Sequence, residues 1–546
     1  EVGLSELAFY IQDEWSVTPK LTVTAGLRHD RQWFDDNPGR VLDVERSFGY
    51  PSSTAPTDNN NISPRLSIAY DLSGDGLSVL RAGAGYFFGR VPLVLGGNVL
   101  GSQRPVFNLT CTGEVGADPG NPIEENAPPS PLDYDTWNPN GLNNPTACAG
   151  TSQLSGTPSY TIWHEDFEYP ETFKANLGYE GFVTEDTRVS VDLIFSQSTN
   201  MFTVRNLNLQ GAQFTLDGED GREVYTPEGS FGPGAANTLG SRVYTDIGDV
   251  YVNFNDGRAR SFAATLEAQH NLTDEVRVRG SYTYTRARDN ASLFCCTSSS
   301  NFSDPMIGAF GPNDLGNFGD EDRGWGPSDF SRDHAFVFSG IAELPWDFEV
   351  AAFWRIQSGR PYTPEVSGDI NGDGVRFNDR PYIFSVADLP LAAADGSEEE
   401  FEQRQLYAQH LAENECLSEH VGGIIPRNTC RTPWTNLLDM RVTKFFRTFG
   451  DQRAELQVDL FNVMNGIGNL LCSDDEFSAD PSDGPCGWGR ITTVSGADRN
   501  IYFADSYDSG SNQILYNVGQ NFGRESVVGD GLLLQFQAQI GFKYYF

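Results

Sequence analysis

Short and long connections alternate along this chain of 546 residues, and this alternation restricts the possible folds more than any other feature. Segments that alternate apolar and polar residues come in pairs, and a tight turn rich in Gly, Asp, Pro or Thr joins each pair. Connections this long are rare in compact soluble domains, where the median is about 4–6 residues. The pattern is typical of an outer-membrane β-barrel with short periplasmic turns and long extracellular loops. The long connections are residues 31–62, 89–171, 199–260, 288–333, 359–436 and 466–531.

About thirteen strands fit this all-β, antiparallel arrangement. The last of them alternates from Leu534 to Phe546, so one face would meet lipid and the other a water-filled lumen. Because barrels of this class have an even number of strands, the chain 1–546 is expected to be a single but incomplete domain that lacks upstream strands. The expected pairs are 7–17 with 21–30, 63–72 with 77–88, 172–183 with 187–198, 261–272 with 276–287, 334–344 with 348–358 and 437–446 with 454–465, followed by 534–546.

Charge and motif content exclude several functions. Lys+Arg number 37 and Asp+Glu 75, so the net charge is −38, and so acidic a chain repels nucleic acid. No apolar run is long enough for a transmembrane helix, although half-apolar barrel strands escape such a search. The histidines are scattered and no catalytic motif is present, so we expect no enzyme activity. His410, Cys416 and His420 share one segment, which we interpret as a loop helix rather than a zinc site.

The eight cysteines all fall in the long connections. Their even number and the extracytoplasmic setting favour disulfides. Whether the adjacent Cys295 and Cys296 bond to each other stays open, because such a bond is strained. The expected pairs, each of which closes one loop, are Cys111–Cys148, Cys416–Cys430 and Cys472–Cys486.

The segment 368–382 resembles the first half of a calcium-binding EF-hand loop. Three oxygen-bearing side chains stand at alternating positions and a glycine follows, as at the start of that loop. The closing glutamate is replaced by Arg380, and no EF-hand helices are expected on either side. The alternative is a turn rich in Asp, Asn and Gly that needs left-handed conformers. The predicted ligands of a structural Ca²⁺ ion are Asp369, Asn371, Asp373, the Val375 carbonyl and Asp379.

Aromatic residues in the long connections are the candidates for contact with a solute, although we expect most of them simply to pack the loops. We expect capture of a solute mainly in the connections 89–171 and 359–436. The candidate aromatic residues are Tyr134, Trp137, Tyr160, Trp163 and Trp325.

Several segments resemble the TonB-dependent receptor family, in particular its Oar-like branch. They include residues 61–92 and 329–363, and the most specific match is 427–446 with 456–465. The closing Phe546 is similar to the C-terminal signal read by the outer-membrane assembly machinery. The resemblance implies a barrel of about 22 strands, of which this chain would supply the last thirteen or so. It also implies a plug domain and a TonB box upstream.

By this resemblance, the intact protein would lie in the outer membrane of a Gram-negative bacterium, with its loops outside. It would bind a scarce solute there and admit it when TonB acts on the plug. The implied partners are outer-membrane lipid, lipopolysaccharide, TonB and a solute that the sequence does not identify. Two alternatives stay open: a passive porin or secretion channel, as in Oar-like export, and a structural surface adhesin.

Overall fold

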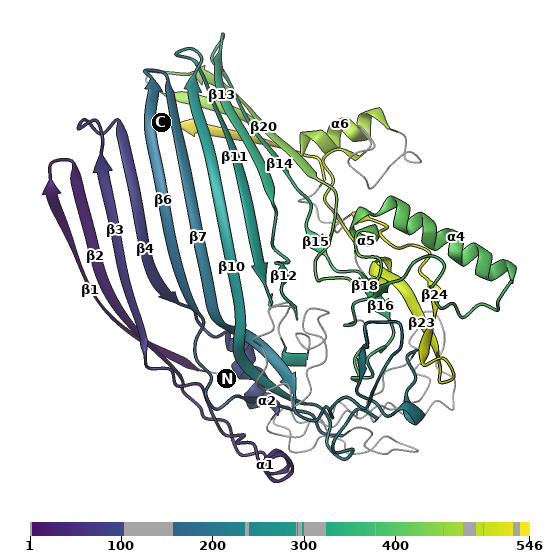
Figure 1. Cartoon of the computed structure of the whole chain (residues 1–546). Coiled ribbons are helices and arrows are strands. Elements are labelled where there is room, and N and C mark those ends of the chain that lie inside the picture. Colours follow the sequence, from purple (N-terminus) through teal and green to yellow (C-terminus); the bar gives the residue numbers. More distant parts are fainter. Residues whose placement is uncertain are drawn as a thin grey trace, which may run out of the picture.

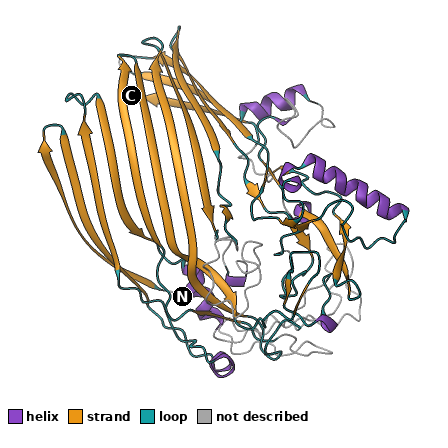
Figure 2. Ribbon diagram, viewed as in Figure 1, coloured by secondary structure: helices purple, strands orange, loops and turns teal. Residues whose placement is uncertain are grey.

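One large antiparallel sheet dominates the computed structural model of the chain (Figures 1 and 2). Each long strand is hydrogen-bonded to the next long strand in sequence, and no helix in the described part is long and apolar enough to cross a membrane. The structure describes residues 3–102, 157–234, 240–290, 292, 297–299, 324–376, 378–450, 452–472, 487–494, 496–527 and 535–546.

The thirteen long strands follow the predicted segments closely, which confirms the fold class. Two of them, β7 and β10, run well beyond the expected ends. The strands are β1 (Leu4–Thr18), β2 (Leu21–Phe34), β3 (Asn61–Asp71), β4 (Ser78–Phe88), β6 (Glu171–Thr184), β7 (Thr187–Asn206), β10 (Val250–Asn271), β11 (Val276–Asp289), β13 (His334–Leu344), β14 (Phe348–Gln357), β20 (Thr435–Arg447), β21 (Arg453–Phe461) and β26 (Gln537–Tyr545).

One predicted strand, 454–465, is wrong at its end. Strand β21 stops at Phe461, and Asn462 takes a left-handed conformation with φ 51°. The side chain of Asn462 then accepts a hydrogen bond from the Asn465 backbone, so it caps the helix α6 (Val463–Leu471). Asn is one of the few residues that both tolerates this conformation and caps a helix, which explains why the strand ends here.

Short turns join the paired strands at one rim of the sheet, and the long connections leave from the other (Figure 1). We call these the turn rim and the loop rim. Cross-strand register gives the sheet an apolar and a polar face, because directly paired residues point the same way. Between β10 and β11, for example, Leu266 pairs with Tyr282 on the apolar face. On the polar face, Arg279 forms a 2.6 Å ion pair with Glu267.

The sheet is open in the described part of the chain. Its end strands, β1 and β26, do not pair with each other. Several edge residues are strongly exposed, including Tyr10 at 76%, Ile11 at 72% and Ile540 at 74%. This agrees with the expected open sheet; that further strands lie upstream stays a prediction.

The long connections hold many short elements instead of irregular chain. The 398–420 segment is helical as predicted, in α4 and α5, whereas the hairpin of β23 and β24 was not expected. These elements are α1 (Leu42–Phe48), α2 (Leu93–Ser102), β5 (Tyr160–Trp163), β8 (Phe214–Thr215), β9 (Glu223–Val224), η1 (Glu228–Ser230), β12 (Gly326–Pro327), β15 (Pro361–Tyr362), β16 (Glu365–Ser367), β17 (Tyr382–Ile383), α4 (Glu398–Glu413), α5 (Glu415–Ser418), β18 (Gly423–Ile424), β19 (Cys430–Arg431), α6, β22 (Thr492–Thr493), η5 (Gly496–Arg499), β23 (Asn500–Asp508), β24 (Gln513–Val518) and β25 (Ser526–Val527).

Three of these connections, 199–260, 359–436 and 466–531, share one apolar core. Strand β16 pairs with β23, and β23 pairs with β24, so segments far apart in sequence form one small sheet. The Tyr502 hydroxyl donates to the Tyr407 hydroxyl (2.7 Å), and the Tyr516 hydroxyl donates to Glu219 (2.6 Å). We call this assembly the loop core; its buried residues include Leu216, Val224, Val366, Ile370, Ile383, Tyr407, Ile501, Tyr502, Ile514 and Tyr516.

A buried arginine ties the connections together at the loop rim. Arg427 is fully buried, and its guanidinium contacts the Asp289 carboxylate at the end of β11. It also donates to the Gly324 carbonyl (3.0 Å) and lies 3.4 Å from the Asp329 carboxylate. A buried charge needs such partners, because it has lost the solvation that water provides.

We therefore expect Arg427→Met to destabilise the protein by about 3–5 kcal/mol, because it leaves the Asp289 carboxylate buried without its cation. Urea unfolding in detergent micelles, followed by tryptophan fluorescence, would measure the change. The matched control is Arg81→Met, since Arg81 forms a 3.2 Å ion pair with Glu180 but its side chain is 54% exposed. That variant should lose at most about 1 kcal/mol. Equal losses in the two variants would contradict the role of Arg427.

Candidate functional site

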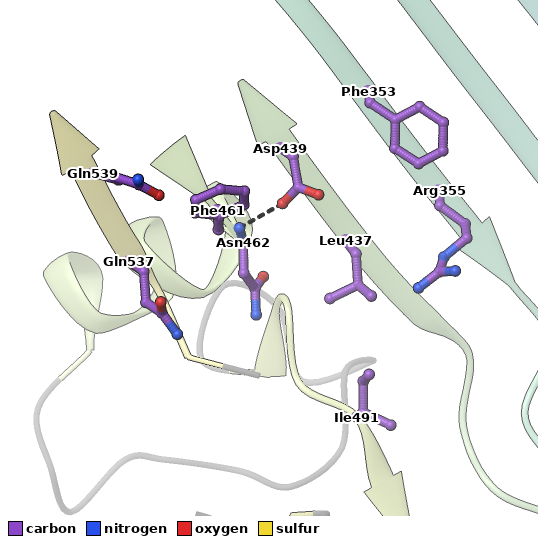
Figure 3. A pocket seen from close by; sticks show the side chains of 9 residues that line it. All are labelled: Phe353, Arg355, Leu437, Asp439, Phe461, Asn462, Ile491, Gln537 and Gln539. Atoms are coloured by element: carbon purple, nitrogen blue, oxygen red, sulfur yellow. Dashed lines mark hydrogen bonds between the residues drawn. The ribbon is translucent and has the colours of Figure 1, made fainter. Parts of the chain in front are cut away.

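A cavity opens on the polar face of the sheet toward the loop rim (Figure 3). Strands β14, β20, β21 and β26 supply most of its wall, and the start of α6 closes one side. The cavity has a volume of about 460 Å³, which lies within the usual range for a small-molecule site. Its lining residues are Phe353, Arg355, Leu437, Asp439, Phe461, Asn462, Ile491, Gln537 and Gln539.

The cavity wall combines apolar surface with hydrogen-bonding groups. Asp439 accepts a hydrogen bond from the Asn462 backbone (2.8 Å), which fixes the helix start against β20. Arg355 lines the opposite wall and, among the described residues, has no ion-pair partner within 4.0 Å. Gln537 and Gln539 contribute two amides from β26 (Figure 3). A guanidinium, amides and aromatic rings together suit a small polar or anionic solute.

The alternation of apolar and polar residues places Arg355, Gln537 and Gln539 on the polar face, but it does not show that they lie together. Alternation does not report which residues of neighbouring strands pair: Gln537 of β26 lies opposite Phe461 of β21, although 75 residues of chain separate them. Helix α6, which closes one side of the cavity, begins within the segment 454–465 that the alternation predicts as a strand. The apolar and polar alternation gave the correct face of each strand, and the cavity follows only from the assembled sheet.

The predicted solute-contacting aromatic residues fall into three groups. Tyr134 and Trp137 lie outside the described residues. Tyr160 and Trp163 are each 2% exposed and pack inside the connections, where the Tyr160 hydroxyl donates to Asp43 (3.0 Å). Trp325 is partly exposed, and the Arg288 guanidinium lies 5.7 Å from the centre of its ring. In this structure, then, Tyr160 and Trp163 have packing roles.

The predicted calcium segment curls tightly inside the loop core. The Asp369 carboxylate accepts from the backbone of Asp373 (2.9 Å) and of Gly374 (3.0 Å). The Asp373 carboxylate accepts from the Val375 backbone (2.7 Å), and Gly374 has φ 92°. These are the contacts of side-chain-capped turns, which the alternative interpretation also expects.

Three acidic side chains are buried together in this segment. Asp369, Asp373 and Asp379 are all at most 3% exposed. Arg222 lies 4.0 Å from the Asp379 carboxylate and also pairs with Glu219 at 2.7 Å. Burial, reinforced by repulsion from Asp369, raises the pKa of Asp373 well above its usual range. Burial raises the pKa of Asp379 to about 7.

Asn378, in the same segment, adds a buried amide beside the aspartates. The Asn378 side-chain amide is buried and donates to the Asp373 carboxylate (2.7 Å), while its Oδ1 atom has no hydrogen-bond partner in the described part of the chain. In the described residues, however, no three His, Cys, Asp or Glu side chains are grouped closely enough to hold a metal ion. An ion here would therefore depend on amide and backbone oxygens as well as on the aspartates.

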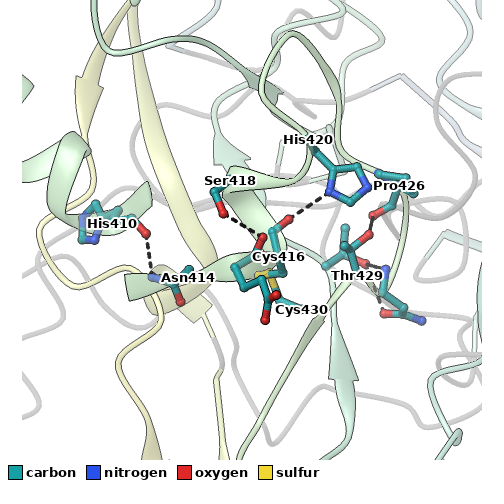
Figure 4. The surroundings of a disulfide bond; sticks show 11 residues. His410, Asn414, Cys416, Ser418, His420, Pro426, Thr429 and Cys430 are labelled. Carbon is teal, nitrogen blue, oxygen red and sulfur yellow. Dashed lines mark hydrogen bonds between the residues drawn. A yellow bond between two sulfur atoms is a disulfide. The ribbon is translucent and has the colours of Figure 1, made fainter. Parts of the chain in front are cut away.

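One predicted disulfide is fully described. Cys416 bonds to Cys430, with their Cα atoms 5.2 Å apart, which joins α5 to β19 (Figure 4). Cys472 is also disulfide-bonded, but its expected partner Cys486 lies outside the described residues, as do Cys111, Cys148, Cys295 and Cys296. Near the bond, His410 contacts the Gly519 carbonyl (2.7 Å) and His420 the Cys416 carbonyl (3.0 Å), so both histidines have backbone partners.

Replacing both cysteines of this bond, Cys416→Ser with Cys430→Ser, should destabilise the loop core by about 3 kcal/mol, because the open segment gains freedom when unfolded. Thermal unfolding and limited proteolysis of the oxidised protein would detect the change. The wild-type protein treated with a reductant is the comparison and should lose at least as much stability, because the reductant also opens the bond of Cys472. Unchanged unfolding and cleavage in both samples would contradict a structural role for this bond.

The family match agrees with this architecture. A family model described as "Outer membrane beta barrel domain" matches residues 4–501 of the chain. None of the curated proteins searched matches it.

Solved outer-membrane transporters are similar to the chain at low identity. The transporter YddB from Escherichia coli is 11% identical, and the match covers 85% of this chain and 41% of that one with a TM-score of 0.43. The FrpB iron transporter from Neisseria meningitidis is 10% identical with the same coverage and a TM-score of 0.38. The ferric citrate transporter FecA is 13% identical, again with the same coverage, at a TM-score of 0.37. The chain thus spans about two fifths of the length of these proteins.

Proposed function

The chain belongs to the outer membrane beta-barrel domain family, and on that premise we propose that it is part of the barrel of a TonB-dependent receptor of the Oar-like branch. In this proposal the loop rim faces the outside of the cell. Further strands and a plug domain of the same protein complete the barrel. The receptor takes up a scarce solute, and TonB supplies the energy through the plug.

The polar-face cavity near the loop rim is the observation that carries this proposal. A solute that enters between the loops meets Arg355, Gln537 and Gln539 before it reaches the rest of the polar face. The Arg355 guanidinium can bind an anionic group through two parallel hydrogen bonds, and the glutamine amides supply hydrogen-bond donors and acceptors. Phe353 and Phe461 offer apolar contact area for the remainder of a solute.

A strain that lacks the gene, complemented with the full-length protein, tests this function. The strain would be grown with peptides, glycans or ferric chelates as the limiting nutrient. We expect the Arg355→Gln strain to need about tenfold more of one nutrient class for the same growth. This corresponds to the loss of about 1.4 kcal/mol of solute binding. Arg81→Gln, on the same face but paired with Glu180, should grow like the wild type.

The alternatives predict different results. A receptor barrel filled by a plug gives no steady conductance in a planar bilayer, and its uptake is lost in a strain without TonB. A passive porin or secretion channel gives a steady open current, and its transport persists without TonB. A surface adhesin leaves growth on every nutrient unchanged, while deletion of the gene lowers attachment to neighbouring cells. Either of the last two results would overturn the receptor proposal.

We also propose that the segment 368–382 binds a structural Ca²⁺ ion within the loop core. The carboxylates of Asp369, Asp373 and Asp379 are buried together, and burial raises the pKa of Asp373 and of Asp379, so a bound divalent cation would stabilise their charged forms. The unpartnered Asn378 Oδ1 supplies an additional buried oxygen beside Asp373. Oxygen atoms of Asn371, Asn378 and the Val375 carbonyl would complete the aspartate set, since Ca²⁺ accepts 6–8 oxygen ligands.

Calcium at about one hundred times its dissociation constant should stabilise the full-length protein by about 2.7 kcal/mol relative to the protein in EDTA. Thermal unfolding with and without the ion measures this shift. Asp373→Asn should remove most of the shift, whereas Asp395→Asn, an exposed residue in the same connection, should retain it. An unchanged melting temperature in calcium, or an equal shift with Mg²⁺, would contradict a calcium site in this segment.

A further inference from the structure

Three arginines stand where the apolar face of the sheet ends at the loop rim. Register places Arg260 of β10 directly opposite Arg288 of β11, and Phe262 opposite Arg286. Toward the turn rim, the same ladder continues with Ala264 opposite Tyr284 and then with Leu266 opposite Tyr282. The apolar face therefore changes from aliphatic to aromatic and then to cationic residues on two neighbouring strands.

The distance of these arginines from the turn rim matches the thickness of the apolar part of the membrane. Ten residue steps lead from Val276, at the turn rim, to Arg286. At about 3.3 Å per residue and a strand tilt of about 40°, those steps rise roughly 25 Å, the height of the apolar band of an outer-membrane barrel. Tyr282 and Tyr284 then fall at the aromatic girdle, and the guanidiniums fall at the level of the lipid headgroups.

Among the residues that the structure describes, this cationic group has no acidic partner. In the described part of the chain, none of the three guanidiniums has a carboxylate within 4.0 Å, although the chain carries 75 acidic residues in total. From Arg260 to His270 and from Val278 to Arg288, the apolar face of the two strands holds no Asp or Glu. Like charges directly opposite each other destabilise a strand pair, so the Arg260–Arg288 pair gains from an external anion.

Two of the three arginine side chains are exposed, and the third is partly buried. Arg260 and Arg286 are exposed. Arg288 is half-buried against the ring of Trp325, whose centre lies 5.7 Å from the guanidinium, and its Nε–H is buried without an acceptor among the described residues. Trp325 thus holds one guanidinium at the rim with an unsatisfied donor. Arg binds phosphate oxygens through parallel N–H donors, and this geometry suits several phosphates on one headgroup.

From this arrangement we propose that Arg260, Arg286 and Arg288 form a binding surface for the headgroup phosphates of an outer-leaflet lipid, of the class to which diphosphorylated lipid A belongs. The lipid chains lie along the apolar ladder of β10 and β11, and the phosphates sit above Tyr282 and Tyr284. The assignment to the outer leaflet rests on the orientation in the proposed function, with the loop rim outside. The surface itself does not depend on solute uptake.

Native mass spectrometry of the full-length protein in detergent, titrated with diphosphorylated lipid A, measures the binding directly. In Arg260→Gln with Arg286→Gln, we expect half-occupancy to need about tenfold more lipid, because two charge-assisted contacts are lost. The matched control, Arg277→Gln with Arg279→Gln, removes the same charge from the polar face of β11 and should bind within about twofold of the wild type. Circular dichroism would confirm that all variants keep their strands.

Two further ligands test whether the arginines recognise phosphate on a lipid or free phosphate. Dephosphorylated lipid A should bind the wild type and the double variant equally weakly, which supports recognition of the phosphates. Inorganic phosphate should compete with lipid A only poorly. The proposal is overturned if the two double variants bind lipid A alike, if the dephosphorylated lipid binds as tightly as the phosphorylated one, or if inorganic phosphate displaces lipid A completely. None of these results bears on TonB-dependent uptake, which the growth assay tests separately.

Discussion

The hydrogen-bond ladder between neighbouring strands is the constraint on which the rest of this structure depends. In hydrocarbon, every backbone N–H and C=O group must find a partner within the protein, and a curved antiparallel sheet provides that partner at each interior strand. Register then decides which side chains meet lipid, because a slip of one residue would exchange the two faces. The pairs Leu266–Tyr282 and Glu267–Ser281, one apolar and one polar, show this separation at adjacent positions.

The strands and hairpins could be predicted from the sequence because each depends on residues that are close together in the chain. Period-two alternation and tight turns fix each hairpin without reference to the remainder of the chain. The errors occur where alternation gives way to longer-range contacts. Strands β7 and β10 run past their expected ends because Val204, Val250 and Val252 are buried between the connections, where β10 also pairs with β5. Strand β21 ends because Asn462 adopts a left-handed backbone conformation, which the alternation of apolar and polar residues does not predict.

The candidate sites were harder to predict because they are assembled from distant segments. The hairpin of β23 and β24 carries a readable signal, since Ile514 and Tyr516 alternate with less buried residues, but the segment was treated as loop. By contrast, no local pattern reports that Tyr160 would bond to Asp43, more than one hundred residues away, and so become part of a core. The calcium segment was visible as a motif, yet its environment, including Arg222, became visible only in the fold.

The loop core has a consequence for the order in which this molecule forms. Its centre joins Glu219 to Tyr516, which are 297 residues apart, and Val366 to Tyr502 in a parallel bridge. Contacts at such separation carry a high cost of loop closure and form slowly. Each hairpin of the sheet can pair as soon as its own two strands exist, whereas the loop core waits for the last connection of the chain. The mouth of the barrel is therefore the last part to mature, after its wall.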